Sequence, residues 1–229
     1  MFKTELHCHS SEVSNCATAN AKFIVEKYLE AGYSTIVLTN HFSTFTFKNK
    51  RFDHSNDPWD KKVDYFINGY NVMKEAADGK LNIILGMELR YYSDPNDYLV
   101  YGVTEEFLRA HPEMMDSKTK NFAPVIKENG MILIQAHPFR NGMMITKPEY
   151  LDGIEVFNGH IGQESRNDIA NLWADKFGLM KTSGTDFHHD YHYPDGGIMT
   201  EKPITNTAEL VETLKSGNYE LIRTNAVPY

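Results

Sequence analysis

Along the chain, short apolar runs rich in β-branched residues alternate with segments of helical periodicity. In residues 19–31, for example, Ile24, Val25 and Tyr28 share one helical face and Gly32 ends the segment. Such alternation favours a parallel sheet covered by helices. The predicted strands cover residues 2–7, 34–39, 82–88, 98–103, 131–136, 153–158, 179–183 and 219–222. The predicted helices cover residues 19–31, 59–77, 117–129, 163–177 and 207–215.

Such a sheet can stay open and doubly wound, or it can close into a (β/α) barrel. In a barrel the functional residues come from the C-terminal ends of several strands, whereas an open sheet gathers them at one switch point. Here imidazole or carboxylate groups follow the first, second, third, fifth and seventh predicted strands. No glycine-rich phosphate loop follows the first strand. We therefore predict an α/β fold of the TIM-like barrel type.

The long loop predicted for residues 42–58 contains the aromatic run Phe42–Phe47. Two interpretations of this run stay open at the level of sequence. Its rings either shape a pocket or pack within the loop.

The first predicted strand carries two histidines, His7 and His9, at its end. Side chains two residues apart on a strand point to the same face, so both imidazoles aim at one point. Other strand ends supply further imidazole and carboxylate groups, which suggests one multinuclear metal site. The remaining candidate ligands are His41, Glu88, His137, Asp186 and His188.

Mixed imidazole and carboxylate ligands suit zinc, manganese or iron. Glu88 follows an apolar strand, where an unpaired buried carboxylate is costly and two bridged cations relieve the cost. Two or three ions about 3.5–4 Å apart acidify a bound water and neutralise phosphoryl charge, which is how such centres hydrolyse phosphate esters. Glu88, Asp186 and His188 are the predicted catalytic residues.

Three residues near these ligands are predicted to bind a small phosphorylated substrate. Arg140, three residues after His137, has the planar fork that binds phosphate through two hydrogen bonds. Asn158 and His160 end the sixth predicted strand and are expected to line the pocket.

Composition limits the partners and the compartment. A net charge of −8 argues against a nucleic-acid polymer or an anionic lipid surface as partner. No apolar run approaches the roughly 20 residues that cross a bilayer. The two cysteines, Cys8 and Cys16, are too few for a disulfide framework, although one bridge between them is conceivable. With no signal peptide recognised, we expect a cytoplasmic location and one domain over residues 1–229.

Taken together, the order and spacing of these motifs resemble the PHP (polymerase and histidinol phosphatase) domain family over nearly the whole chain. The resemblance implies a distorted seven-stranded (β/α) barrel, a trinuclear metal centre and phosphoesterase activity. The segments that carry it are His7-x-His9-Ser10, Thr39-Asn40-His41, Gly86-x-Glu88, Ala136-His137-Pro138, Glu155-x-x-Asn158 and Gly184-Thr185-Asp186-x-His188.

The resemblance also implies how the ligands divide among three ions. They are His7, His9, Glu88 and Asp186 at the first ion, Glu88 and His137 at the second, and His41 and His188 at the third.

The chain departs from the family pattern in three places. Many members have a further His or Asp a few residues after the His-x-His pair, where this chain has Ser14-Asn15-Cys16. We therefore expect a weakly bound third ion, with Glu12 or Cys16 as an extra ligand. Asp97 stands where many members have a histidine, so it either ligates the second ion or leaves that ion one ligand short. Asn40 replaces a usual acid.

The sequence thus predicts metal-dependent hydrolysis of the phosphate ester of a small metabolite. Histidinol phosphate, a sugar phosphate and a nucleotide are all compatible with it. Two alternatives remain. One is an amidohydrolase-type C–N hydrolase, which also begins with His-x-His but commonly bridges its metals with a carbamylated lysine. The other is a non-catalytic, metal-stabilised domain.

Overall fold

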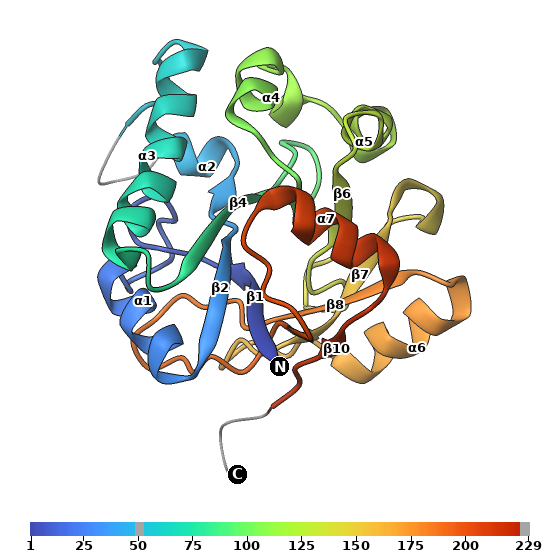
Figure 1. Ribbon diagram of the computed structural model, residues 1–229. Helices are drawn as coiled ribbons and strands as arrows, with labels where there is room; N and C mark the ends of the chain where they lie inside the picture. Colours follow the sequence, from blue (N-terminus) through green and yellow to red (C-terminus); the bar gives the residue numbers. More distant parts are fainter. Residues whose placement is uncertain (49–52, 225–229) are drawn as a thin grey trace.

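One mixed sheet of ten strands organises the residues that the computed structural model describes, which are 1–48 and 53–224 (Figure 1). Along the sheet the strands follow the order β10-β9-β1-β2-β4-β5-β6-β7-β8, and β3 pairs with β4 outside this path. The strands are β1 (Phe2–Cys8), β2 (Tyr33–Leu38), β3 (His41–Phe42), β4 (Asn82–Leu89), β5 (Tyr98–Tyr101), β6 (Ile132–Gln135), β7 (Gly153–Asn158), β8 (Met180–Gly184), β9 (Ile198–Thr200) and β10 (Glu220–Leu221).

The sheet curls until β1 lies next to the chain that follows β8. Cys8 forms a parallel bridge with Phe187, and the amide of His9 donates to the carbonyl of Phe187 at 2.9 Å. Parallel pairing of β1 with β2, β2 with β4, β6 with β7, and β7 with β8 builds most of the wall. The predicted fold class is confirmed, as a distorted and nearly closed α/β barrel.

The prediction of a parallel sheet is wrong at β5 and at β9, which runs antiparallel to β1 and β10. β5 runs antiparallel to both of its neighbours, β4 and β6. Only residues 90–97 connect β4 to β5, and they contain no helix. A parallel return needs a crossover of a dozen or more residues, so this short connection can only reverse the chain.

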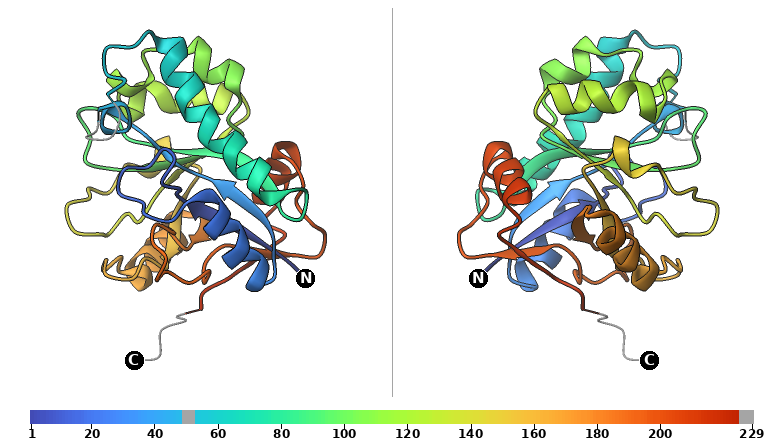
Figure 2. Two further views of the ribbon diagram at one scale, coloured as in Figure 1. Left: turned by 90° about the vertical axis from the view of Figure 1, so that its left-hand side faces the viewer. Right: turned by 90° about the vertical axis from the view of Figure 1, so that its right-hand side faces the viewer.

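The helices lie outside the sheet (Figure 2). α1 packs beside α3, and α6 covers β7. None of the helices in the described part of the chain is both long and apolar enough to cross a membrane. They are α1 (Ala21–Glu30), α2 (Thr44–Phe47), α3 (Trp59–Ala77), α4 (Glu105–Ala110), α5 (Thr119–Glu128), α6 (Asn167–Phe177) and α7 (Thr207–Ser216), with short 3-10 turns η1 (Met114–Asp116) and η2 (Pro148–Tyr150).

Local sequence signals fix the ends of several helices. The side chain of Asn20 accepts the amide of Phe23 and so caps α1. Gly178 ends α6 in the left-handed conformation, with φ of 61°. α6 begins later than the prediction of 163–177 because Arg166 also adopts a left-handed conformation, with φ of 49°.

The predicted loop 42–58 contains α2 and overlaps the end of β3, and neither element was predicted; its residues 49–52 lie outside the described residues. Phe42 and Phe47 are buried in the core, whereas Phe45 is 69% exposed. Both interpretations of the aromatic run are therefore compatible with the structure, each for different rings.

Apolar side chains fill the barrel interior just before the strand ends that carry the polar residues. Leu6 precedes His7, and Ile134 lies three residues before His137. Burying each such side chain contributes about 1.5–3 kcal/mol to the stability of the fold. The polar residues at the strand ends therefore lie on a closely packed apolar layer. The buried members of this cluster include Leu6, Val37, Ile84, Leu99, Tyr101, Ile132 and Ile134.

Candidate metal centre

The buried carboxylate of Glu88, near the end of β4, touches four imidazoles from other strand ends. Its Oε1 lies 3.3 Å from Nε2 of His7 and 3.1 Å from Nε2 of His137. Its Oε2 lies 3.3 Å from Nε2 of His9 and 2.7 Å from Nδ1 of His41. Each carboxylate oxygen therefore has two imidazole neighbours of its own. A carboxylate in this position is able to bridge two cations.

Asp186 and His188, which follow β8, complete the group. Oδ1 of Asp186 lies 3.3 Å from Nε2 of His7 and 3.5 Å from Nε2 of His9. The His188 ring stacks on that of His9, with ring centroids 4.2 Å apart. The structure thus brings together all seven predicted ligands at one end of the barrel.

Hydrogen bonds fix the tautomers of the first two histidines. Nδ1 of His7 donates to Oε1 of Glu155 at 2.9 Å. The hydroxyl of Ser14 donates to Asn40, so it accepts from Nδ1 of His9 at 3.1 Å. When each ring is neutral, its lone pair is therefore on Nε2, and the two Nε2 atoms lie 3.0 Å apart. An acceptor behind Nδ1 is the usual support of a metal-ligating imidazole.

The same arrangement holds for His188, whose Nδ1 donates to the backbone carbonyl of Asp186 at 2.9 Å. At Glu88, Oε2 has no partner with hydrogen-bond geometry in the described part of the chain, although Nδ1 of His41 is only 2.7 Å away. A carboxylate this close to several imidazole nitrogens suits a shared cation once the imidazoles lose their extra protons.

Opposite charges hold both carboxylates in the ionised form. Burial raises the pKa of Glu88, but His41 and His7 more than offset this and hold it well below its usual range. The pKa of Asp186 is likewise low, because His7 and Arg140 outweigh its burial. Burial lowers the pKa of His7, yet the surrounding carboxylates, led by Asp186, keep it well above its usual value. The group is therefore a dense set of charges that suits a divalent cation.

The three predicted substrate residues border the same site. Nη2 of Arg140 donates to Oδ2 of Asp186 at 2.7 Å and to Oδ1 of Asn158 at 2.8 Å. The amide of Asn158 donates to Asp186 at 3.2 Å. The His160 ring lies 5.5 Å from that of His188. Arg140 and His160 line a cleft of about 450 Å³ together with Glu88 and Asp186.

Comparison with known proteins identifies the family. The family model of the PHP domain matches residues 5–214. The chain belongs to the PHP domain family. The comparison with curated proteins finds no match.

Solved structures share the fold of this PHP domain at low sequence identity. A two-domain protein from Bacteroides vulgatus, which contains an inferred PHP-like metal-dependent phosphoesterase, is 16% identical with a TM-score of 0.68. The match covers 97% of this chain but spans only 64% of that protein's length. A candidate metal-dependent phosphoesterase from Bifidobacterium adolescentis is 15% identical with a TM-score of 0.55, covering 93% of this chain and 96% of its own.

An amidohydrolase from Chromobacterium violaceum, solved with bound sulfate and no metal, has the same fold. It is 14% identical with a TM-score of 0.55, and the match covers 96% of this chain and 98% of that one.

Two buried glutamates support the PHP site, and the sequence analysis assigned a role to neither. Glu155 on β7 accepts from His7 through Oε1, and through Oε2 it accepts the amide of His137 at 2.9 Å and the Asn158 side chain at 2.9 Å. Glu5 accepts the amide of His7 at 2.8 Å, and burial raises its pKa. Glu5 stands two residues before His7, and Glu155 stands three residues before Asn158. This spacing was visible in the sequence.

The residues expected to complete the metal sites are Glu12, Cys16 and Asp97. Of these, the structure brings only Cys16 to the third metal site, next to His41 and His188. Cys16 is a free cysteine, so no bridge to Cys8 forms. Burial raises the pKa of Cys16, but hydrogen bonds with His188 and His41 lower it to about 6. Glu12 instead accepts the backbone amide of Ala21 at 3.0 Å, at the start of α1.

Asp97 does not face the second pair of ligands freely. Its carboxylate is held by Arg90 through both oxygens, and its Oδ2 lies 3.9 Å from Nε2 of His137. Arg90 therefore occupies both oxygens of a residue that borders the same cleft as Glu88 and His137.

A further histidine group beside the site, formed by His160, His189 and His192, has nitrogens within 4.8 Å of one another. The amide of His188 donates to Nδ1 of His192 at 3.1 Å. That bond places the proton of the neutral ring on Nε2, which is the opposite of the tautomer in His7 and His9. Since a metal needs the lone pair that this proton blocks, we do not assign an ion to this group.

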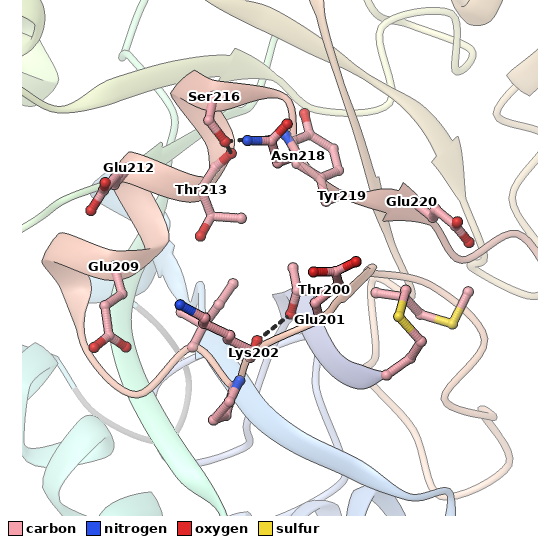
Figure 3. Close-up of a pocket in the computed structure, with 14 residues that line it drawn as sticks. Thr200, Glu201, Lys202, Glu209, Glu212, Thr213, Ser216, Asn218, Tyr219 and Glu220 are labelled. Carbon is pink, nitrogen blue, oxygen red and sulfur yellow. Dashed lines mark hydrogen bonds between the residues drawn. The ribbon is translucent and has the colours of Figure 1, made fainter.

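Two larger hollows lie away from these ligands. One of about 780 Å³ opens between α7 and the strands β9 and β10 (Figure 3). Its labelled lining residues include Lys202, Glu209, Glu212 and Tyr219, and none of the seven predicted ligands borders it. Size alone therefore does not locate the chemistry.

Proposed function

We propose that this PHP domain hydrolyses the phosphate ester of a small metabolite, using two or three divalent ions of zinc, manganese or iron. The observation that carries the proposal is the position of Glu88. Its buried carboxylate lies between imidazoles from three other segments, and among the described residues Oε2 accepts no hydrogen bond of good geometry. Two ions bridged in this way are typical of centres that hydrolyse phosphate esters.

We take the division of these ligands from the family resemblance and add Cys16 at the third ion. We assign His7, His9, Glu88 and Asp186 to the first ion, Glu88 and His137 to the second, and His41, His188 and Cys16 to the third.

When bound, divalent ions acidify a water and neutralise charge on the phosphoryl group. The chain's own residues supply the positioning. Arg140, already directed by Asn158, offers its guanidinium to the phosphate oxygens. Burial lowers the pKa of His160 to about 4, so at neutral pH it is uncharged and orients the ester through hydrogen bonds. Glu155 holds His7 in the ligating tautomer.

The amidohydrolase relative keeps C–N hydrolysis as the second candidate. That chemistry commonly uses a carbamylated lysine as the bridge, whereas no lysine lines the cleft in the described part of the chain. Glu88 takes the bridging place instead. A phosphate ester is therefore the better match to this ligand set.

The test is hydrolysis of a panel of phosphate monoesters and matched amides by protein stripped of metal and then reloaded with manganese or zinc. We expect phosphate release only from reloaded protein, and a loss of several orders of magnitude in Glu88→Gln. The matched control is Glu149→Gln, since Glu149 is exposed and makes only a loose contact with Lys147. Hydrolysis of the amides alone, or equal rates with and without metal, would contradict the proposal.

A further inference from the structure

The cleft over the candidate ligands branches beyond Arg90. Cys16 and His41 line both this cleft and a hollow of about 320 Å³. Ser43 and Phe45 line that hollow and another of about 380 Å³. Arg90 borders all three spaces. We call the two smaller hollows the side cleft. Arg90 therefore lies where the side cleft joins the cleft over the candidate ligands.

Asp97 fixes the guanidinium of Arg90 in one orientation. Nε donates to Oδ1 at 2.6 Å, and Nη2 donates to Oδ2. Asp97 is itself buried, and its carbonyl accepts the amide of Ala136 at 3.0 Å, so the anchor is part of the sheet. Within residues 1–48 and 53–224, Nη1 donates no hydrogen bond. A pre-oriented arginine loses little conformational freedom when it binds an anion.

The acidic side chain at the larger hollow does not compete with a bound anion for this arginine. Asp94 is the acidic residue that borders it. The carboxylate of Asp94 already accepts from the amide of Asn96 at 3.0 Å and from the hydroxyls of Tyr98 and Thr119 at 2.8 and 3.1 Å. The unused donors there belong to Arg90 and to neighbouring hydroxyl groups.

Exposed aromatic rings flank the same space. Phe45 is 69% exposed and Tyr92 is 76% exposed, and both border the larger hollow. Phe42 and Phe47 are buried on either side of Phe45 and hold its short helix in place. Exposed aromatic rings offer an apolar surface to a bound molecule.

We infer that the side cleft binds the leaving group of the substrate and that Arg90 selects a leaving group with a second anionic group, either a carboxylate or a phosphate. The apolar body of the leaving group lies against Phe45 and Tyr92. The inference rests on the proposed phosphoesterase function. It makes Arg90 a binding residue for the part of the substrate that is released, distinct from Arg140 at the transferred phosphate.

The experiment compares three matched esters: phenyl phosphate, 4-carboxyphenyl phosphate and 1,4-phenylene bisphosphate. Values of kcat/KM are measured for metal-loaded wild-type protein and for Arg90→Gln. The double variant Arg90→Gln/Asp97→Asn avoids leaving a buried carboxylate unpaired. The matched control is Arg109→Gln, since Arg109 pairs with Asp64 and Glu105 on the surface.

We expect the wild-type protein to prefer at least one of the two esters with a second anionic group over phenyl phosphate. Both Arg90 variants should reduce that preference by about 10–100-fold, the usual effect of losing a charge-assisted hydrogen bond. Arg109→Gln should keep the preference. The preferred one of these two esters shows whether the second anionic group is a carboxylate or a phosphate.

An equal fall in kcat/KM for all three esters would overturn the inference, because Arg90 would then act on the common phosphate or on stability. Equal kcat/KM values of the wild-type protein for all three esters would overturn it as well. Calorimetric binding of the same three compounds is measured in parallel. If none is hydrolysed, the phosphoesterase function fails. The binding preference and its loss in the Arg90 variants then decide the role of the side cleft separately.

Discussion

Replacing Glu155 by glutamine tests how the ligands are oriented without touching the proposed bridging residue. Oε1 of Glu155 accepts from Nδ1 of His7, and Oε2 accepts from the amide of His137 and from Asn158. All three partners are donors. Glutamine keeps the shape but has one oxygen and one NH2 group, so one side of the contact must fail.

The cost follows from which side fails. If the NH2 group faces His7, Nδ1 of that ring must become the acceptor and the proton moves to Nε2, which removes the lone pair aimed at Glu88. If it faces the amide of His137, a buried donor is left unpaired at about 1–3 kcal/mol. Loss of such a support typically weakens metal binding or activity 10–100-fold, which is about 1.4–2.8 kcal/mol.

The assay is calorimetric titration of metal-free protein with zinc or manganese, followed by phosphatase turnover. Glu155→Gln should bind the first ion 10–100-fold more weakly, whereas Glu149→Gln should match the wild-type protein. Thermal unfolding of the metal-free forms checks that both variants fold. If Glu155→Gln folds and binds metal as tightly as the wild-type protein, the reasoning from the tautomer of His7 is wrong.

Three further predictions concern the same centre. Metal affinity should fall as the pH drops through the raised pKa values of His7 and His41, because carboxylates keep those pKa values high and a metal must displace the protons; a pH-independent affinity would contradict this. Cys16→Ser should weaken the third equivalent in a metal titration and leave the first two in place, whereas loss of all equivalents would show a wider role. Arg140→Ala should chiefly raise KM, and unchanged steady-state parameters would remove its role as a phosphate ligand.

Much of the fold follows from periodicity and end signals. The alternating strands and helices, and the polar residues at strand ends, were sufficient to predict the barrel. The direction of β5 was missed because each strand was assigned from its own pattern, and the shortness of the connection 90–97 was not weighed. α2 and β3 are too short to show a period.

The candidate ligands were easier to predict from the sequence than their supports. The spacing of His7 and His9 predicts them as ligands, and the position of Glu88 after an apolar strand does the same. Glu155 has the same place on β7, but its role depends on donors from two other strands. Asp97 shows the limit of matching positions. Its pairing with Arg90 is a contact across residues 90–97 that a strand pattern does not reveal.

The measurement that tests the central claim most directly is a crystal structure of protein purified without chelator, with anomalous scattering data and elemental analysis of the same sample. We predict at least two ions, both in contact with the carboxylate of Glu88, and a third, weaker position near His41, His188 and Cys16. Less than one equivalent of metal, with no gain and no anomalous density near Glu88 after addition of manganese or zinc, would contradict the account.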